Sequence, residues 1–224
     1  KKEILDSVPE SERESRSKGL PTMGSGTVYP LALEDIVVPD FPIPDHYKRI
    51  GGLDVGWHFT AAGWIAQDPD TGVCYLYSEY KRSKAEPIVH AAALKLRGDW
   101  INIAVDPASL GRGQADGKQI FSMYKKHGIR CHAADNAVEA GIYKVWEMLS
   151  TGQLKIFKSC IETQKEYLTY RRDEQGRVIK ENDHLMDGAL RYPCMSLKYA
   201  RQKPVRTNTN NKGFAGAAGI AYDI

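Results

Sequence analysis

Apolar and polar residues alternate over six short stretches in the middle of the chain, and this pattern predicts six strands. The first three stretches follow one another closely, with a turn rich in Asp, Pro and Gly at 68–72 before the third. Longer segments separate the other three. The predicted strands cover residues 50–54, 60–66, 73–81, 100–105, 129–133 and 154–157.

The longer segments between these strands have helical spacing and predict helices over 86–97, 117–127 and 140–150. Gly128 is suited to cap the second helix, and Thr151-Gly152 stops the third. The order is three strands, then alternating helices and strands. We therefore predict an α/β fold of the ribonuclease H-like class, a mixed sheet flanked by helices.

The two ends of the chain differ from this regular middle. Residues 1–16 are charged and predict a short helix, and residues 17–49 are irregular and rich in Gly and Pro. The last segment, from Arg201, is polar and rich in Gly and Ala, with little apolar mass to bury. We therefore predict a linker that wraps the domain over 1–49, the folded domain over 50–200 and a flexible tail over 201–224.

Composition is that of an ordinary globular chain, with 42% hydrophobic and 26% charged residues among 224. No apolar run approaches the roughly 20 residues of a membrane span, and no signal peptide is visible after Lys1-Lys2-Glu3. The chain also lacks an initiator Met, so we expect a fragment of a longer protein. A net charge of +3 is compatible with a basic face opposite an acidic pocket.

The four cysteines contain no CxxC pair, which argues against a zinc site and against a disulfide framework. A reducing cytoplasm is the natural compartment for such a chain.

Two aspartates stand at the ends of predicted strands. Asp54 ends the first strand, and Asp106 ends the fourth, directly before Pro107. These two strands are neighbours in the predicted sheet, so we expect the two carboxylates to meet at one sheet edge.

A second pair of aspartates, Asp183 and Asp187, lies four residues apart where a helix is predicted to begin, which puts both on one helix face. Carboxylate oxygens suit Mg²⁺ or Mn²⁺. Two such ions about 3.5–4 Å apart activate a water and stabilise the leaving oxygen in phosphodiester hydrolysis. The sequence therefore predicts a carboxylate cluster that holds two divalent ions.

Each of these signals also has an ordinary structural interpretation. An aspartate at a strand end is usually a turn or cap residue, and two acids at a helix start often complement the helix dipole. His184 is more often a structural hydrogen-bonding residue than a ligand. Gly51, Gly52 and Gly56 do not form a phosphate loop, because the GxGxxG spacing is missing. What favours the site is three acids in order on suitable elements.

Residues 24–199 resemble the C-terminal nuclease domain of the large terminase subunits of tailed bacteriophages. The resemblance is carried by segments 24–30, 52–56, 105–108 and 166–168, and most specifically by Glu-Asn-Asp-His-Leu-Met-Asp-Gly-Ala-Leu-Arg-Tyr at 181–192. Gly188 is a small departure, because many relatives run from this Asp directly to Ala.

This resemblance implies an endonuclease that trims concatemeric double-stranded viral DNA during genome packaging into procapsids, with two Mg²⁺ or Mn²⁺ ions. The family's catalytic acids fall on Asp54, Asp106 and Asp183, with Asp187 as a fourth candidate, and the direct ligand among Asp183 and Asp187 stays open. The implied partners are double-stranded DNA, the portal protein and the small terminase subunit, in the cytoplasm of the infected bacterial host. The family's ATPase domain is absent here, because no GxxxxGK(S/T) motif occurs.

Residues 167–180 predict a β-hairpin that leads into the acidic helix, with a turn at 173–176 in which Gly176 supplies a positive φ. Four basic residues on it are predicted to hold DNA phosphates beside the active site: Arg171, Arg172, Arg177 and Lys180. A solvated connector is the alternative. Eight other basic residues are further candidates, of which only some are expected to contact DNA: Lys81, Arg82, Lys84, Arg97, Arg112, Lys118, Lys125 and Lys126.

Two other functions fit the same residues. The domain could be a non-catalytic docking module that binds the portal or other motor subunits, its acids purely structural. It could also be a junction-resolving nuclease of the same fold.

Overall fold

The structure is a computed structural model that describes residues 26–56, 58–106 and 116–205. For residues 116–120 it describes the backbone only. The helix predicted over 1–16 and most of the tail predicted over 201–224 lie outside these residues. Among the described helices, none has the length and apolar character needed to cross a membrane.

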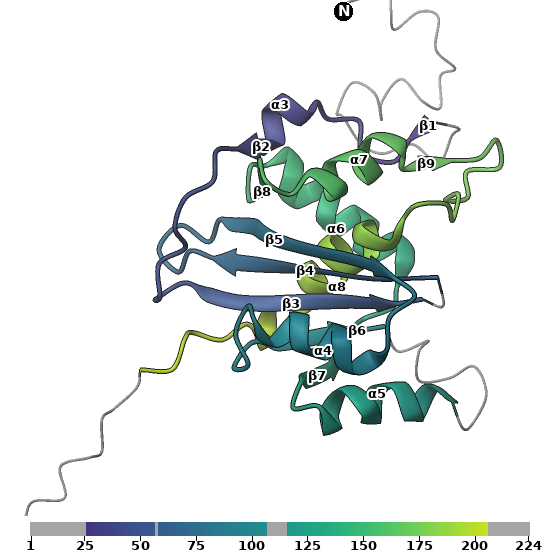
Figure 1. Ribbon diagram of the computed structural model, residues 1–224. Coiled ribbons are helices and arrows are strands. Elements are labelled where there is room, and N and C mark those ends of the chain that lie inside the picture. Colours follow the sequence, from purple (N-terminus) through teal and green to yellow (C-terminus); the bar gives the residue numbers. More distant parts are fainter. Residues whose placement is uncertain (1–25, 57, 107–115, 206–224) are drawn as a thin grey trace, which may run out of the picture.

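A seven-stranded mixed sheet forms the centre of the molecule (Figure 1). Its antiparallel part consists of three long strands, β3 (Lys48–Val55), β4 (Phe59–Gln67) and β5 (Cys74–Ser83). Strand β4 pairs with both β3 and β5. The remaining strands are parallel to their neighbours. In spatial order the strands are β2 (Val37–Val38), β8 (Leu154–Phe157), β5 (Cys74–Ser83), β4 (Phe59–Gln67), β3 (Lys48–Val55), β6 (Asn102–Val105) and β7 (Arg130–Ala133). The predicted ribonuclease H-like mixed sheet is confirmed.

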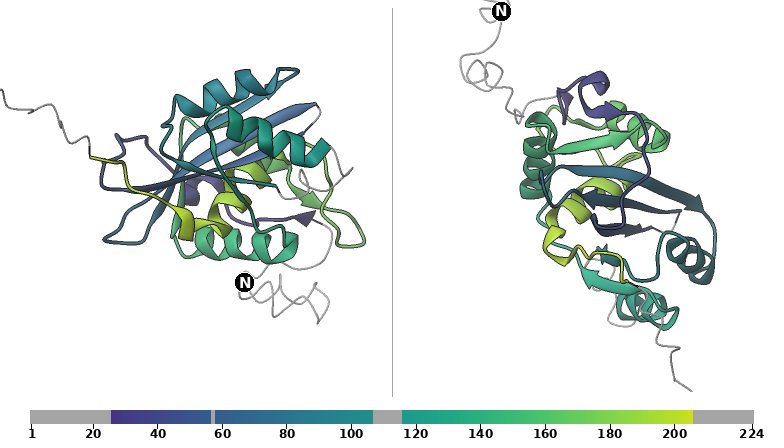
Figure 2. Two further views of the ribbon diagram at one scale, coloured as in Figure 1. Left: turned by 90° about the horizontal axis from the view of Figure 1, so that it is seen from below. Right: turned by 90° about the vertical axis from the view of Figure 1, so that its left-hand side faces the viewer.

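Helices cover both faces of the sheet (Figures 1 and 2). One face carries α4 (Pro87–Lys95) and α5 (Asp116–Lys126). Pro87 begins α4, where the missing backbone N–H leaves no helical hydrogen bond unmade. The other face carries α6 (Val138–Ser150), α7 (Ile161–Thr169), the π-helix η2 (Met186–Arg191) and α8 (Tyr192–Met195), and the chain then passes through the short η3 (Leu197–Tyr199).

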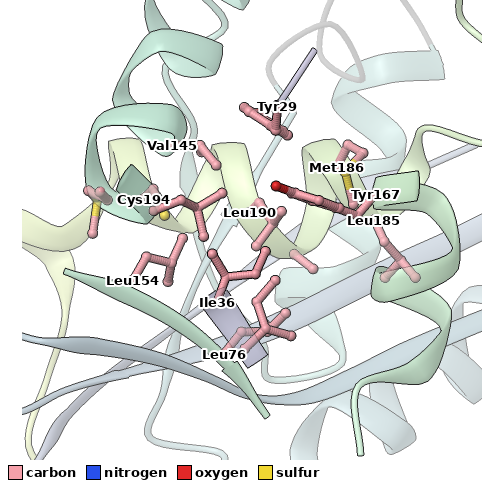
Figure 3. Packing of buried hydrophobic residues seen from close by; sticks show 14 of the residues in the cluster. Tyr29, Ile36, Leu76, Val145, Leu154, Tyr167, Leu185, Met186, Leu190 and Cys194 are labelled. Carbon is pink, nitrogen blue, oxygen red and sulfur yellow. The ribbon is translucent and has the colours of Figure 1, made fainter. Parts of the chain in front are cut away.

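Two apolar cores correspond to these two faces. The larger core lies under α6, α7 and η2, where Figure 3 shows Leu185, Met186 and Leu190 packed among residues of the sheet and of α6. The smaller core lies under α4 and α5 and includes Leu53 and Val105. Because adjacent residues of a strand point to opposite faces, the positions that follow Leu53 and Val105 point toward the η2 face.

The described part of the predicted linker belongs to the folded domain. Residues 26–49 contain β1 (Gly26–Thr27), α3 (Leu33–Ile36) and β2, which extends the sheet beside β8. Val28 and Tyr29 are buried, and the Tyr29 ring stacks on Tyr167 at 5.6 Å between centroids. This stretch is thus more regular than the predicted arm, because its few apolar side chains enter the core between the Gly and Pro residues.

The predicted hairpin is shorter than expected. Helix α7 continues to Thr169, and β9 contains only Arg171–Arg172, which pairs with β1 and bridges to Val178. The predicted turn is present, with Gly176 at a φ of 77°. The basic hairpin is therefore a small loop at 171–179. It lies beside the start of residues 181–192, which contain Asp183 and Asp187 and are called the acidic segment below.

Candidate active site

Asp54 and Asp106 lie at neighbouring positions on one edge of the sheet. Strands β3 and β6 are parallel with Leu53 opposite Val105, and the amide of Asp106 donates to the carbonyl of Leu53 at 3.4 Å. Both aspartates are half-buried. The prediction that these strands are neighbours is confirmed.

Asp183 and Asp187 stand on one turn of the segment that covers this edge. The amide of Asp187 donates to the carbonyl of Asp183 at 3.2 Å, and helical structure begins at His184. Burial raises the pKa of the Asp183 carboxyl, and the negative charge of Asp187 raises it further. Like charges are therefore gathered at this site.

The acidic segment then widens into the π-helix η2, which the sequence did not predict. A single extra residue in a helix is commonly accommodated as such a π-turn, often at functional sites. Gly188 lies inside it. A Cβ at Gly188 would lie 2.7 Å from the carbonyl oxygen of Ala61 and 3.1 Å from the amide nitrogen of Asp54. The missing side chain therefore lets Asp187 approach the strand that carries Asp54.

His184 contacts Asp54 directly, with Nδ1 2.8 Å from Oδ2. Burial raises the pKa of Asp54, as do the nearby charges of Asp187 and Asp106, and the hydrogen bond to His184 opposes them. The same hydrogen bond raises the pKa of His184. The hydrogen-bonding role that the sequence favoured for His184 is thus the one the structure has, and its partner is a predicted site residue.

Asp187 is held by an arginine that sequence reasoning missed. Nε of Arg191 donates to Oδ1 of Asp187 at 2.6 Å, and the Arg191 side chain is buried with its guanidinium over the Tyr192 ring. The four-residue separation on a helix was the signal that could have identified this pair.

The tightest group of potential metal ligands lies elsewhere. Within residues 26–56, 58–106 and 116–205, one group of three has all its ligand atoms within 4.8 Å of one another, namely His46, Asp68 and Asp70. It lies at the opposite end of β3, which from Lys48 to Asp54 extends roughly 20 Å. The carboxylate of Asp68 accepts hydrogen bonds from the amide of Asp70 at 3.0 Å and from Thr71 Oγ1 at 2.8 Å. These bonds explain Asp68 as a residue that stabilises the turn.

One of the four predicted DNA-binding residues is not available for that role. Arg172 is 6% exposed, and its guanidinium donates to both carboxylate oxygens of Glu139 and to the carbonyl of Gly176. The reason is the alternation of the short strand β9, which turns Arg172 inward and Arg171 outward. Arg171, Arg177 and Lys180 are exposed, and Arg177 pairs with Asp173 at 3.1 Å.

Two hollows flank the sheet edge. One of about 550 Å³ is lined by Arg171, Ile179, Glu181 and Asn182, with parts of β1 and the end of α7. The other, of about 950 Å³, lies on the α4 and α5 face and starts at Val55 and Gly56, directly after Asp54. Its charged wall is formed by Arg82, Lys84 and Glu86.

The arrangement has counterparts in known proteins. The family model described as "Terminase RNaseH-like domain" matches residues 51–196. The terminase large subunit of Salmonella phage P22 is 34% identical over 209 residues, which cover 90% of this chain and 42% of that protein. The chain thus spans less than half the length of this curated relative.

Solved structures agree with this assignment. The P22 large terminase nuclease domain superimposes with a TM-score of 0.75 and 30% identity, over 81% of this chain and 97% of that one. The large terminase nuclease domain of bacteriophage SPP1, solved with bound Mn, has the same fold, with a TM-score of 0.53 and 16% identity over 70% of this chain and 93% of that one. This chain therefore belongs to the terminase RNaseH-like domain family, as the nuclease domain of a phage terminase large subunit.

Proposed function

We propose that this domain is a metal-dependent endonuclease that cleaves concatemeric double-stranded viral DNA during genome packaging into procapsids. The observation that carries the proposal is the convergence of Asp54, Asp106, Asp183 and Asp187 on one edge and one face of the sheet. These acids come from three separate elements. Structural capping explains a single aspartate, but it gives no reason for four to gather where they repel one another.

The donor set fits Mg²⁺ or Mn²⁺. Four half-buried carboxylates supply oxygen ligands, which these hard ions prefer, and bound cations would offset the burial and the mutual repulsion that raise the pKa of Asp54 and Asp183. The SPP1 nuclease domain was solved with Mn, which favours the same kind of ion here. Two such ions supply an activated water and a stabilised leaving oxygen.

Two further residues orient the acids in this proposal. His184 fixes one oxygen of Asp54, and Arg191 fixes one oxygen of Asp187. Partners of this kind hold metal-binding groups in a productive orientation.

DNA contact is assigned to basic side chains on both sides of the acids. Arg171, Arg177 and Lys180 lie on the hairpin side, and Arg82 and Lys84 lie in the hollow behind Gly56. Cleavage of a long concatemer depends little on base reading, so these contacts should be to phosphates. Arg172 is excluded from the set, because it pairs with Glu139.

The remaining parts of the proposal concern the whole protein. The chain covers 42% of its P22 relative, so the ATPase domain would lie in the rest of the polypeptide. The portal protein and the small terminase subunit are the proposed partners, and the host cytoplasm is the proposed location.

The deciding experiment is nicking of a supercoiled plasmid with Mn²⁺, with and without EDTA. Cleavage that EDTA abolishes and that Asp54→Asn also abolishes supports the nuclease. A folded domain that leaves the plasmid intact would support the docking module instead. Faster cleavage of branched than of linear DNA would point to a junction-resolving enzyme.

A further inference from the structure

Glu166 is a nearly fully buried acid outside the carboxylate cluster. It lies on α7 and is 3% exposed. Its Oε1 accepts a hydrogen bond from Nζ of Lys81 at 2.7 Å, and its Oε2 accepts one from the amide of Leu185 at 2.6 Å. A buried carboxylate is tolerated only when it is paired and hydrogen-bonded, and both oxygens meet that condition. The residue therefore joins β5, α7 and the acidic segment at one point.

The Leu185 end of this contact lies in the first turn of the acidic segment. The first amides of a helix have no partner within the helix, and here one of them is satisfied by an acid 19 positions earlier in the chain. A carboxylate at this end also complements the helix dipole. Leu185 lies between Asp183 and Asp187, so the contact fixes the turn that presents both acids.

The Lys81 end lies on the same sheet face as the cluster. Asp54 is opposite Ala61 on β4, and Ala61 is opposite Lys81 on β5. Residues directly opposite one another share a face, so Lys81 is two strands, roughly 10 Å, from Asp54. Its ammonium lies 5.1 Å from the centre of the Phe59 ring, and that ring lies 5.8 Å from the ring of His184.

We propose that Glu166, neutralised by Lys81, is a positioning residue that sets the turn of Asp183, His184 and Asp187 against Asp54 and Asp106. This role rests on the proposed function. Glu166 does not bind the metal in this scheme, because both of its oxygens already have partners. Its removal should therefore weaken divalent metal binding through geometry alone.

The test is calorimetric titration of Mn²⁺ into the purified domain, at a temperature where circular dichroism shows every variant folded. We expect Glu166→Ala to weaken Mn²⁺ affinity by about 10- to 100-fold, as is typical when a residue that orients metal ligands is lost. Glu166→Gln should weaken it less, because its amide oxygen still accepts from Leu185. Lys81→Met leaves Glu166 buried without its cation, so this variant should also weaken Mn²⁺ binding. It tests the positioning role of Glu166 even if Glu166→Ala does not fold.

The control is Glu139→Ala, which removes another acid paired with a basic side chain, Arg172, away from the acidic segment. It should lower the melting temperature and leave Mn²⁺ affinity unchanged. Folded Glu166→Ala and Lys81→Met domains that bind Mn²⁺ as the wild type does would overturn the positioning role alone. A folded wild-type domain that binds no divalent ion would overturn the proposed function and this role with it.

Discussion

Arg172 and Glu139 form a two-pronged ion pair, with Nη1–Oε1 and Nη2–Oε2 distances of 2.9 and 2.7 Å. The arginine is 5% exposed at its side chain and the glutamate 66%. The pair ties the hairpin strand β9 to the start of α6, which makes Arg172 part of the scaffold under the hairpin.

Arg172→Met should therefore lower the free energy of unfolding by about 1.5–3 kcal/mol, the usual contribution of hydrogen bonds to a charged group. The pair holds the pKa of Glu139 below its ordinary value of 4.5. Its stabilising contribution is thus present at neutral pH and is lost as the pH falls through that lowered pKa. Urea unfolding at pH 7 and pH 3 checks this, and an equal difference between wild type and variant at both pH values would contradict it.

The exposed basic residues of the hairpin should bind DNA phosphates, in contrast to Arg172, which stabilises the fold. Arg171→Ala with Lys180→Ala should flatten the plot of log affinity against log salt by up to about two units, at about 0.9 per phosphate contact. Binding should weaken alike on unrelated sequences. Fluorescence anisotropy measures the slope, with Lys48→Ala/Lys203→Ala as a control that removes the same charge near the start of β3. Equal slopes for the two double variants would make the hairpin a solvated connector.

The hollow behind Gly56 should bind the DNA phosphate backbone independently of the hairpin. Arg82→Ala with Lys84→Ala should flatten the salt slope by up to about two units and should add to the effect of the hairpin variants, because distant sites act additively. Melting temperature should change little, since both residues are exposed. A slope that equals the wild-type slope would remove this hollow from the DNA surface.

Asp54→Asn should abolish cleavage and leave the fold intact. Asparagine retains an oxygen that can accept from His184 but loses the negative charge that a divalent ion needs. One fewer charge among Asp54, Asp106 and Asp187 relieves repulsion, so the melting temperature without metal should hold or rise. Plasmid nicking in Mn²⁺ and a thermal melt in EDTA provide the two readouts. Near wild-type nicking by this variant would refute its assignment to the site.

Cleavage should require Mg²⁺ or Mn²⁺ and be poorly supported by Ca²⁺, which prefers more ligands at longer distances. Asp106→Ala should sharply weaken Mn²⁺ binding in calorimetry. Unchanged affinity in that variant would remove Asp106 from the ligand set.

The four aspartates that sequence analysis proposed for the site share a local signal. Asp54 and Asp106 stand where apolar strands end, and the spacing of Asp183 and Asp187 is visible along a single helix. Such periodic patterns were enough to predict six of the seven strands of the mixed sheet and the helices α4, α5 and α6, whereas α7 was not predicted.

The features that were missed depend on contacts between distant parts of the chain. Lys81 and Glu166 are 85 positions apart, and nothing near either residue announces the pair. Arg171 and Arg172 are adjacent and chemically identical, and only their register in β9 separates an exposed side chain from a buried one. Strand β2 has two residues, too few for any alternation to be recognised.

The contacts of residues 28–31 with residues 167–170 also limit the order in which the domain can fold during its synthesis. The amide of Val28 donates to the carbonyl of Tyr170, and the hydroxyl of Tyr167 donates to the carbonyl of Leu31, 136 positions away. At about 5–20 residues per second of ribosomal synthesis, the arm waits roughly 7–27 s for these partners. Contacts of such long range also slow folding, because the closure entropy of the loop must be overcome first. The larger core also needs Leu185, Met186 and Leu190, so it closes last, after the acidic segment itself has left the ribosome.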